Sequence, residues 1–191
     1  MGLDLKGYLA YQCFQMLKME HDLRELYDLL WKEVENFEIK ELFRTRSESL
    51  GDGVRHLEQA LEKLSAGLPL PTRQAGARAL EAAPGVLVLM AEKGGHPVTQ
   101  GILQEHQTFM RLDPSQAVIE IHHLQEADRV EQAEIVAYDS LIGLAEELHE
   151  PGVAELLQAN RTQEVESRRL LQERRRAVLR EYHEAERREA A

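Results

Sequence analysis

The chain has 191 residues, which is enough for one ordinary hydrophobic core, so we expect a single domain over residues 1–191. Asp and Glu number 34 against 23 Lys and Arg, and the formal charge of -11 repels phosphate backbones, which argues against nucleic-acid binding. The single cysteine, Cys13, excludes an internal disulfide framework, and the sequence shows neither a secretory signal pattern nor an apolar run of membrane-spanning length, so we expect a cytoplasmic protein that binds no membrane.

The first expected helix covers roughly residues 4–34. Aromatic residues make up only 5% of the chain while Ala, Leu, Glu, Arg and Gln dominate, which favours an all-α fold. Apolar residues recur in this segment with the three-then-four spacing of a core-facing stripe: Leu9, Cys13, Met16, Leu23, Tyr27, Leu30 and Val34. Glu20 falls on the same stripe. We therefore expect an inert buried thiol at Cys13 and an inward carboxylate at Glu20.

A second helix is expected at about residues 38–65, after a break near Asn36. Its apolar stripe has Ser47 as a polar exception and consists of Phe43, Leu50, Val54, Leu57, Leu61 and Leu64. Gly51 and Gly53 are poor helix formers, so this turn is either tightly packed or locally weak. Prolines and glycines then interrupt residues 66–112, where two short apolar blocks, 75–90 and 98–112, are interpreted as crossover helices.

A third long helix is expected to open with Asp113 as N-cap and Pro114 at its first position, and to end at about His149. Its expected inward positions are Ile121, Leu124, Glu131, Ile135, Tyr138, Leu141, Ala145 and Leu148. We interpret Tyr27, Trp31 and Tyr138 as core and helix-interface packing rather than as an electron-transfer chain.

The last helix is expected to run from Val153 towards the C-terminus. Its inward positions would be Val153, Leu157, Asn160, Glu164, Ser167, Leu171 and Val178. Beyond Leu171 the sequence is rich in Arg and Glu of mixed sign, so residues 172–191 are expected to extend from the bundle into solvent or onto a protein partner. Because the amphipathic helices exceed what short crossover segments can cover, we also expect a homodimer.

The segment RVEQAEIVAY at residues 129–138 resembles the third-helix signature R-V-E-H-Y-E-I-A-A-Y of the bacterial ferritin-like stress-response family typified by YciE and YciF. Shorter matches occur at residues 39–43, 54–59 and 154–157. The resemblance implies a ferritin-like four-helix bundle with short crossover helices between the second and third long helices. It also implies a link to stress responses.

The same resemblance implies a metal site built from inward carboxylates. Carboxylate-bridged metal pairs in four-helix bundles use a Glu from two helices and a Glu-x-x-His from the other two. The acidic positions of the family fall on Glu20, Glu131, Glu134 and Glu164. The second helix departs from the family pattern, because Ser49 and Gly53 stand where relatives have a Glu and a His, and Asp52 and His56 are the weaker substitutes.

Arg168 lies one turn after Glu164 and is expected to pair with that carboxylate in the charge role of a metal. This favours a degenerate or weak metal site without catalysis. The first alternative is a di-iron or di-manganese carboxylate enzyme that handles peroxide or oxygen. The second is an interaction module that uses the Arg/Glu-rich C-terminal helix.

Other candidate motifs carry less chemistry. His122 and Glu126 share a helix face and could form a metal-binding pair, although such pairs on acidic helices are usually solvated. The sequence has no Gly-rich phosphate loop, nucleophile elbow or paired C-x-x-C, so nucleotide hydrolysis, acyl transfer and zinc-finger roles have no positive support.

Overall fold

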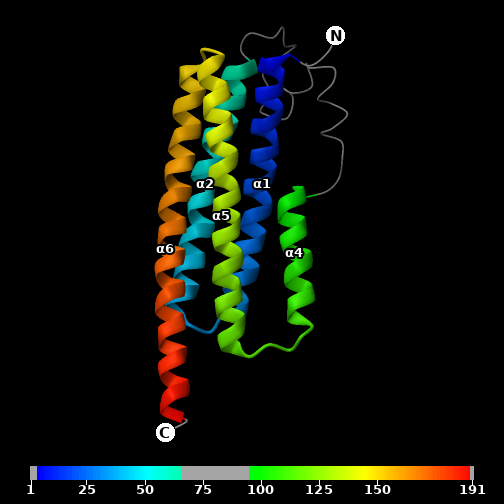
Figure 1. Cartoon of the computed structure of the whole chain (residues 1–191). Coiled ribbons are helices and arrows are strands. Elements are labelled where there is room, and N and C mark those ends of the chain that lie inside the picture. Colours follow the sequence, from blue (N-terminus) through cyan, green and yellow to red (C-terminus); the bar gives the residue numbers. More distant parts are fainter. Residues whose placement is uncertain (1–3, 66–94, 190–191) are drawn as a thin grey trace.

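The computed structural model describes residues 4–65 and 95–189, and every regular element within these ranges is a helix. Four long helices form a bundle: α1 (Leu5–Glu33), α2 (Phe37–Ser65), α5 (Gln116–Glu147) and α6 (Pro151–Glu189). A shorter helix, α4 (Pro97–Met110), lies outside the bundle beside α1 (Figure 1). The all-α expectation is confirmed for the described residues, as is the second crossover helix, whereas the expected helix at 75–90 lies outside them.

The connection between α2 and α5 sets the topology of the bundle. Helices α1 and α2 are antiparallel, as are α5 and α6, and the long connection that contains α4 lets α2 and α5 run in the same direction (Figure 1). Helix α1 packs against α2 and α5, and α6 packs against the same two helices. All four long helices therefore face one shared interior. None of the described helices is long and apolar enough to cross a membrane.

Local capping explains where the first two helices begin. The Asp4 side chain accepts a hydrogen bond of 2.7 Å from the backbone N–H of Gly7, which satisfies one of the free donors in the first turn of α1. Asn36 accepts from the backbone N–H groups of Glu38 and Ile39 at 3.0 and 3.3 Å. The expected break near Asn36 is therefore an N-cap for α2.

Helix α5 begins two residues later than the sequence predicted. Asp113 has a φ of 52°, in the left-handed region, so it cannot adopt the extended backbone of an N-cap. Its N–H instead bonds to the carbonyl of Met110 at 3.3 Å and closes the turn that follows α4. Ser115 takes the N-cap position, and the expected roles of Asp113 and Pro114 are wrong.

The turn between α5 and α6 follows a compact C-cap pattern. His149 has a φ of 57°, and the N–H of Glu150 bonds back to the carbonyl of Ala145 at 2.9 Å, the arrangement of a Schellman motif. Pro151 then occupies the first turn of α6, where its missing N–H costs nothing. Helix α6 thus begins two residues before the expected start at Val153.

The predicted apolar stripes form the core. Of the positions named for α1, every one is buried, and Tyr27 and Tyr138 are among the largest fully buried side chains. Burying each large apolar side chain stabilises the fold by about 1.5–3 kcal/mol. Of the three aromatic residues that were expected to pack in the core or between helices, Trp31 is the exception, because 38% of it stays exposed. On α2, Arg46 rather than Ser47 is the polar residue that points inward.

The C-terminal part of α6 packs further along the bundle than expected. Val178 is fully buried, and the Tyr182 hydroxyl donates to the Glu120 carboxylate of α5. Arg174 donates to the side-chain oxygen of Asn36 at 3.2 Å, in the turn between α1 and α2. The remaining end of α6 projects beyond the other helices (Figure 1). The expected extension from residue 172 therefore begins later, after Tyr182.

Candidate functional site

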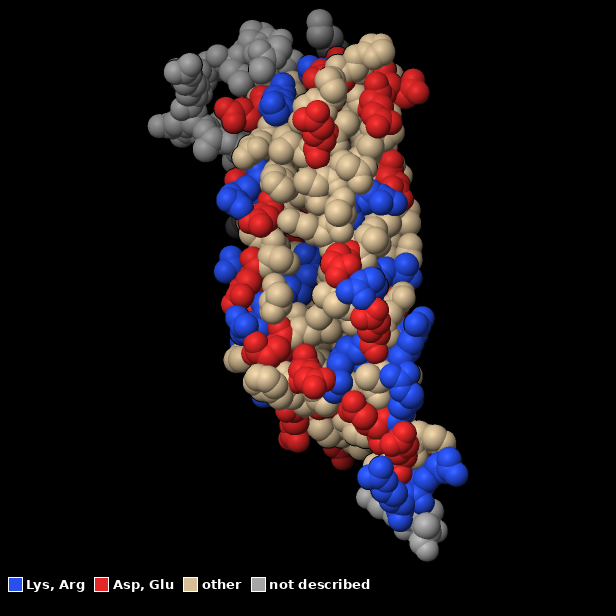
Figure 2. All heavy atoms as spheres, turned by 90° about the vertical axis from the view of Figure 1, so that its left-hand side faces the viewer, with Lys and Arg blue, Asp and Glu red and all other residues tan. Residues whose placement is uncertain are grey.

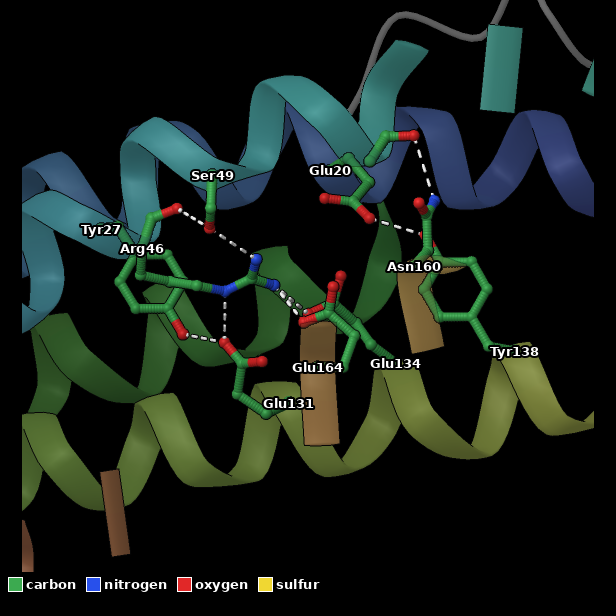
Figure 3. A network of polar contacts seen from close by, with 10 residues as sticks. Glu20, Tyr27, Arg46, Ser49, Glu131, Glu134, Tyr138, Asn160 and Glu164 are labelled. Atoms are coloured by element: carbon green, nitrogen blue, oxygen red, sulfur yellow. Dashed lines mark hydrogen bonds and ion pairs between the residues drawn. The ribbon is translucent and has the colours of Figure 1, made fainter. Parts of the chain in front are cut away.

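Four carboxylates meet in the middle of the bundle (Figure 3). Glu20 comes from α1, Glu131 and Glu134 from α5, and Glu164 from α6, and each is at most 1% exposed. Oxygen atoms of Glu20, Glu134 and Glu164 lie within 4.8 Å of one another, a spacing that one metal ion could bridge. The four positions named from the sequence thus share one interior site, and three of them form a compact trio.

Arg46 of α2 also points into this site (Figure 3). Its Nε donates to Glu131 at 2.7 Å, and its Nη2 donates to Glu134 at 3.3 Å and also to Glu164. The side chain is only 4% exposed, and its Nη1 lies 3.3 Å from the Ser49 hydroxyl. One guanidinium therefore links three carboxylates from two helices.

Sequence analysis missed Arg46, although a signal was present. Starting at Phe43, the three-then-four spacing of α2 passes through Arg46, Leu50, Gly53 and Leu57, all of which are buried. The stripe predicted from the sequence has Ser47 as its polar exception instead. Ser47 instead donates to Asp28 near the surface at 2.9 Å.

The charges of the site do not balance when every group is ionised. Four carboxylates and one guanidinium leave three uncompensated negative charges in a buried space. Burial, followed by repulsion from the neighbouring carboxylates, raises the pKa of Glu134 and Glu164 well above the usual range, and burial also raises the pKa of Glu20. Burial alone lowers the pKa of Arg46, but the three carboxylates reverse this and hold it well above its ordinary value.

The Glu20 carboxylate belongs to a hydrogen-bond network that reaches three other helices. The Tyr138 hydroxyl donates to it at 2.6 Å, and Asn160 in turn donates to that hydroxyl at 3.0 Å and to the carbonyl of Gly53 at 3.1 Å. A Cβ on Gly53 would lie 2.8 Å from a Glu20 oxygen. The glycine therefore gives the Glu20 carboxylate the space that a side chain would take, and close packing is the reason for this residue in α2.

The two buried tyrosines are more than packing residues. Tyr27 donates its hydroxyl to Glu131, as Tyr138 does to Glu20. Burial and the nearby carboxylates raise the pKa of both phenols well above the usual value, so both stay protonated and act as donors. Both aromatic rings are buried as expected, and their hydroxyls hold the two ends of the carboxylate cluster.

Arg168 does not take the role that the sequence suggested. Its Nε donates to Asp128 of α5 at 2.9 Å, and the side chain is 34% exposed. Residue 168 is four positions after Glu164, but the helix turns its long side chain towards the rim of the α5–α6 contact. The expected Arg168–Glu164 pair is therefore wrong, and Arg46 supplies the internal positive charge.

The two weaker substitutes on α2 do not join the trio. Asp52 is exposed and pairs with Arg55 one turn later. His56 is half-buried, and its Nδ1 lies 2.6 Å from the Asn160 side-chain oxygen rather than against a carboxylate. His56 therefore supports Asn160, which in turn supports Tyr138.

The donor set fits one cation better than two. Among the described residues, one oxygen of each of Glu20, Glu131, Glu134 and Glu164 is buried without a hydrogen-bond partner. Carboxylate oxygens of this kind suit a hard divalent cation. However, Arg46 already binds three of the carboxylates, and Gly53 and Ser49 of α2 contribute no ligand. The trio of Glu20, Glu134 and Glu164 shares two members with the Arg46 contacts, and its three unpaired oxygens suit a single ion or shared protons.

A second group of ionisable residues, which sequence analysis did not assemble, lies between α1, α4 and α5. Glu33, His106 and His123 bring ligand atoms within 4.8 Å of one another. The possible metal pair of His122 and Glu126 does not form: His122 stacks on Phe109 with ring centroids 3.7 Å apart, and Glu126 pairs with Arg129. Glu33 and His106 carried no sequence signal, because their partners lie 73 to 90 positions away.

This bundle of four long helices, with inward carboxylates on three of them, is a ferritin-like helical bundle. The chain belongs to the family described as "Domain of unknown function (DUF892)", which matches residues 74–184. No curated protein matches its sequence.

Solved structures of three bacterial proteins share the fold. The stress protein YciF of E. coli is 15% identical, with a TM-score of 0.73 over 93% of this chain and 98% of that one. YcfI of Rhodopseudomonas palustris is 17% identical, with a TM-score of 0.71 over 88% and 93% of the two chains. A protein from Xanthomonas campestris is also 17% identical, with a TM-score of 0.65 over 96% and 99%. The resemblance to the YciE and YciF family is thereby confirmed.

Proposed function

We propose that this chain is a stress-response bundle whose two-metal carboxylate centre is degenerate, so that Arg46 stands in for one cation and the Glu20–Glu134–Glu164 trio holds at most one. The contacts of Arg46 with three buried carboxylates carry this proposal. The stress role rests on the family resemblance and on the described role of the E. coli neighbour, a stress protein. Under this proposal the chain is not a peroxide- or oxygen-consuming enzyme.

The bundle interior must compensate the negative charge of its buried carboxylates. A buried carboxylate is costly unless it is paired, protonated or bound to a metal. In a two-metal site the cations would supply that compensation, and ligands would be needed from all four helices. Here α2 supplies a positive charge where the family places ligands. A second cation near Glu131 would have to displace the guanidinium and would meet no ligand from Ser49.

The proposal is tested by metal stoichiometry. Each chain carries His123→Gln, which disables the separate group of Glu33, His106 and His123, so that only the carboxylate centre is counted. The chain with no other change is treated with chelator, loaded with Fe²⁺ or Mn²⁺ without oxygen, and desalted, and we expect no more than one metal ion per chain. The double variant Arg46→Leu/Ser49→Glu removes the guanidinium and restores a carboxylate from α2, so it should bind a second ion. Arg168→Leu is the matched control, because this arginine lies outside the site, and it should behave as the wild type.

Two metal ions bound per chain in the His123→Gln background, together with rapid consumption of peroxide or oxygen by the loaded protein, would overturn the proposal. That result would assign the chain to the di-iron or di-manganese carboxylate enzymes, with Glu20, Glu131, Glu134 and Glu164 as ligands. Binding of one ion without turnover supports a weak remnant site, and binding of none supports a site held entirely by Arg46 and protons.

Association with other chains is the second part of the proposal. Figure 2 shows Lys and Arg interspersed with Asp and Glu along one face of the molecule, and both signs occur on its projecting end. Alternating charges of this kind favour another protein over a phosphate backbone as a partner. We infer that the bundle forms a homodimer and that the C-terminal end of α6 is available to a protein partner.

A further inference from the structure

The group between α1, α4 and α5 has the ligand types of a transition-metal site. His106 of α4 and His123 of α5 are 3% and 0% exposed. Their Nε2 atoms lie 3.1 and 2.8 Å from the same oxygen, Oε2 of Glu33 at the end of α1. Two imidazoles and one carboxylate therefore converge on one point from three separate helices.

The spacing suits a tetrahedral ion. Zinc binds imidazole nitrogen and carboxylate oxygen at about 2.0–2.1 Å, which places tetrahedral ligands about 3.3 Å apart. The two Nε2–Oε2 distances, 3.1 and 2.8 Å, are about 0.2 and 0.5 Å shorter than this separation. Small side-chain rotations would open the group around an ion, without any change in the helices.

The surroundings leave one coordination position for solvent. Glu33 is 25% exposed, whereas both imidazoles are buried, so an ion would be reached from the carboxylate side. Three protein ligands with an open fourth position form a recurrent zinc arrangement. His122 lies close by, with its ring centroid 6.0 Å from that of His123, but it stacks on Phe109 beside a surface hollow and is not part of the converging set.

We propose that Glu33, His106 and His123 form a mononuclear site for a zinc-class divalent ion, with water as the fourth ligand, and that this ion fastens α4 to the bundle. Helix α4 makes its described contacts with α1 and α5. At the N-terminus of α4, the His96 backbone N–H and the Thr99 hydroxyl donate to Asp22 of α1. The proposed site would secure the other half of α4. This proposal is independent of the carboxylate centre, which involves different residues.

Cobalt binding tests the site directly. The chelator-treated wild type is titrated with Co²⁺, and we expect one equivalent to give the visible absorption of a tetrahedral nitrogen–oxygen complex, which Zn²⁺ then abolishes by displacement. His106→Gln and His123→Gln should each weaken binding by at least about 100-fold, beyond the effect known for lost supporting groups around a metal. His122→Gln is the matched histidine control and should bind Co²⁺ as the wild type does.

Two further measurements separate this site from the carboxylate centre and from misfolding of the variants. Glu20→Gln removes one member of the carboxylate trio and should leave the cobalt spectrum unchanged, which separates this site from the bundle centre. Hydrogen exchange of α4 amides should slow on addition of Zn²⁺ in the wild type and not in His123→Gln, whose helical content is checked by circular dichroism. A wild type without tetrahedral cobalt absorption, or a spectrum that survives in both folded His→Gln variants, overturns the proposal.

Discussion

Arg46 is the positive charge among three buried carboxylates, so the stability of the bundle centre depends on this residue. Removing one partner of a buried ion pair leaves the other charge without compensation, at a typical cost of about 3–5 kcal/mol. We therefore expect Arg46→Met to lose stability of this order. Arg168→Met should lose about 0–1 kcal/mol, because its pair with Asp128 is partly exposed. Urea unfolding of both variants in chelator measures the difference, and equal losses would contradict this role for Arg46.

The carboxyl groups of the site should make stability depend on pH in an unusual direction. The pKa of Glu134 is raised well above its ordinary value of 4.5, mainly by burial, so the folded state holds this proton more tightly than the unfolded chain. Its contribution is fully present below about pH 4.5 and is lost as the pH rises through the raised folded value. Glu134→Gln should therefore gain stability relative to the wild type as the pH increases from 4.5.

Glu120 provides the opposite case in the same helix. Burial opposes its ionisation, but hydrogen bonds from Tyr182, the Asn36 backbone and Gln116 hold its pKa below the ordinary value. Its contribution is present above about pH 4.5 and disappears as the pH falls through the folded value. Glu120→Gln should thus be less stable than the wild type at neutral pH and approach it in acid. Melting curves of both variants and the wild type in chelator from about pH 3 to pH 8 test the two predictions, and parallel curves would refute the assignment.

For single residues, the sequence identified the buried carboxylates but not the arginine that pairs with them. An inward Glu is visible because it interrupts an apolar stripe, and Glu20, Glu131 and Glu164 were found in this way, whereas Glu134 was named from the family resemblance. The choice of counter-charge depends on how a long, flexible side chain turns from its helix. Arg168 and Arg46 are both within reach of inward faces by spacing, and only the packing of α2 on α1 and α6 shows which one is buried.

The C-terminal part of α6 packs against the bundle through Tyr182. Tyr182 reaches Glu120, and Glu120 accepts from the backbone N–H groups of Glu35 and Asn36 at 3.1 and 2.8 Å. The last third of α6 is therefore tied, through α5, to the turn between α1 and α2. Spacing alone could not predict this, because the Arg/Glu-rich sequence after Leu171 looks uniformly solvated.

A truncation series tests this tie. A chain that ends after Leu171 loses the buried Val178 and the Tyr182 hydrogen bond, so we expect it to unfold at a clearly lower temperature. A chain that ends after His183 keeps both contacts and should melt close to the full-length protein. Tyr182→Phe separates the hydroxyl from the packing and should cost about 1–3 kcal/mol, because it leaves a charged acceptor short of a donor. Equal melting of both truncations would show that this part of α6 is only a solvated extension.

For the whole molecule, the fold class was the most predictable feature, because helix periodicity, capping residues and composition all agree. The four long helices, the second crossover helix and the apolar stripes were all predicted, and the helix boundaries moved by only a few residues. Those shifts have local causes: Asp113 and His149 adopt left-handed backbone conformations that a sequence pattern does not show. The sites were less predictable, since they depend on residues brought together from three or four helices.

The outer surface bears on the expected homodimer. Several exposed large apolar side chains belong to the segments around the α1–α2 turn and the start of α5, or to the last part of α6: Trp31, Phe37, Leu112, Val118 and Leu179. Figure 1 places both turns at the same end. Exposed apolar side chains at one end would suit association, and a second copy of the chain would offer a self-complementary partner.

We therefore predict a dimer at micromolar concentration that depends on this end of the molecule. Phe37 and Leu112 are 73% and 75% exposed, so neither contributes much to the core, and Phe37→Asp/Leu112→Asp should leave the helical content intact. Burying a charged group in an apolar interface is costly, so the variant should be monomeric. Val136→Asp is the matched control, because Val136 is 56% exposed on α5 away from both turns and should leave the mass unchanged. Light scattering coupled to size exclusion measures all three proteins: a monomeric wild type would refute dimerisation itself, and a dimer that survives in the double variant would place its interface on another face of the bundle.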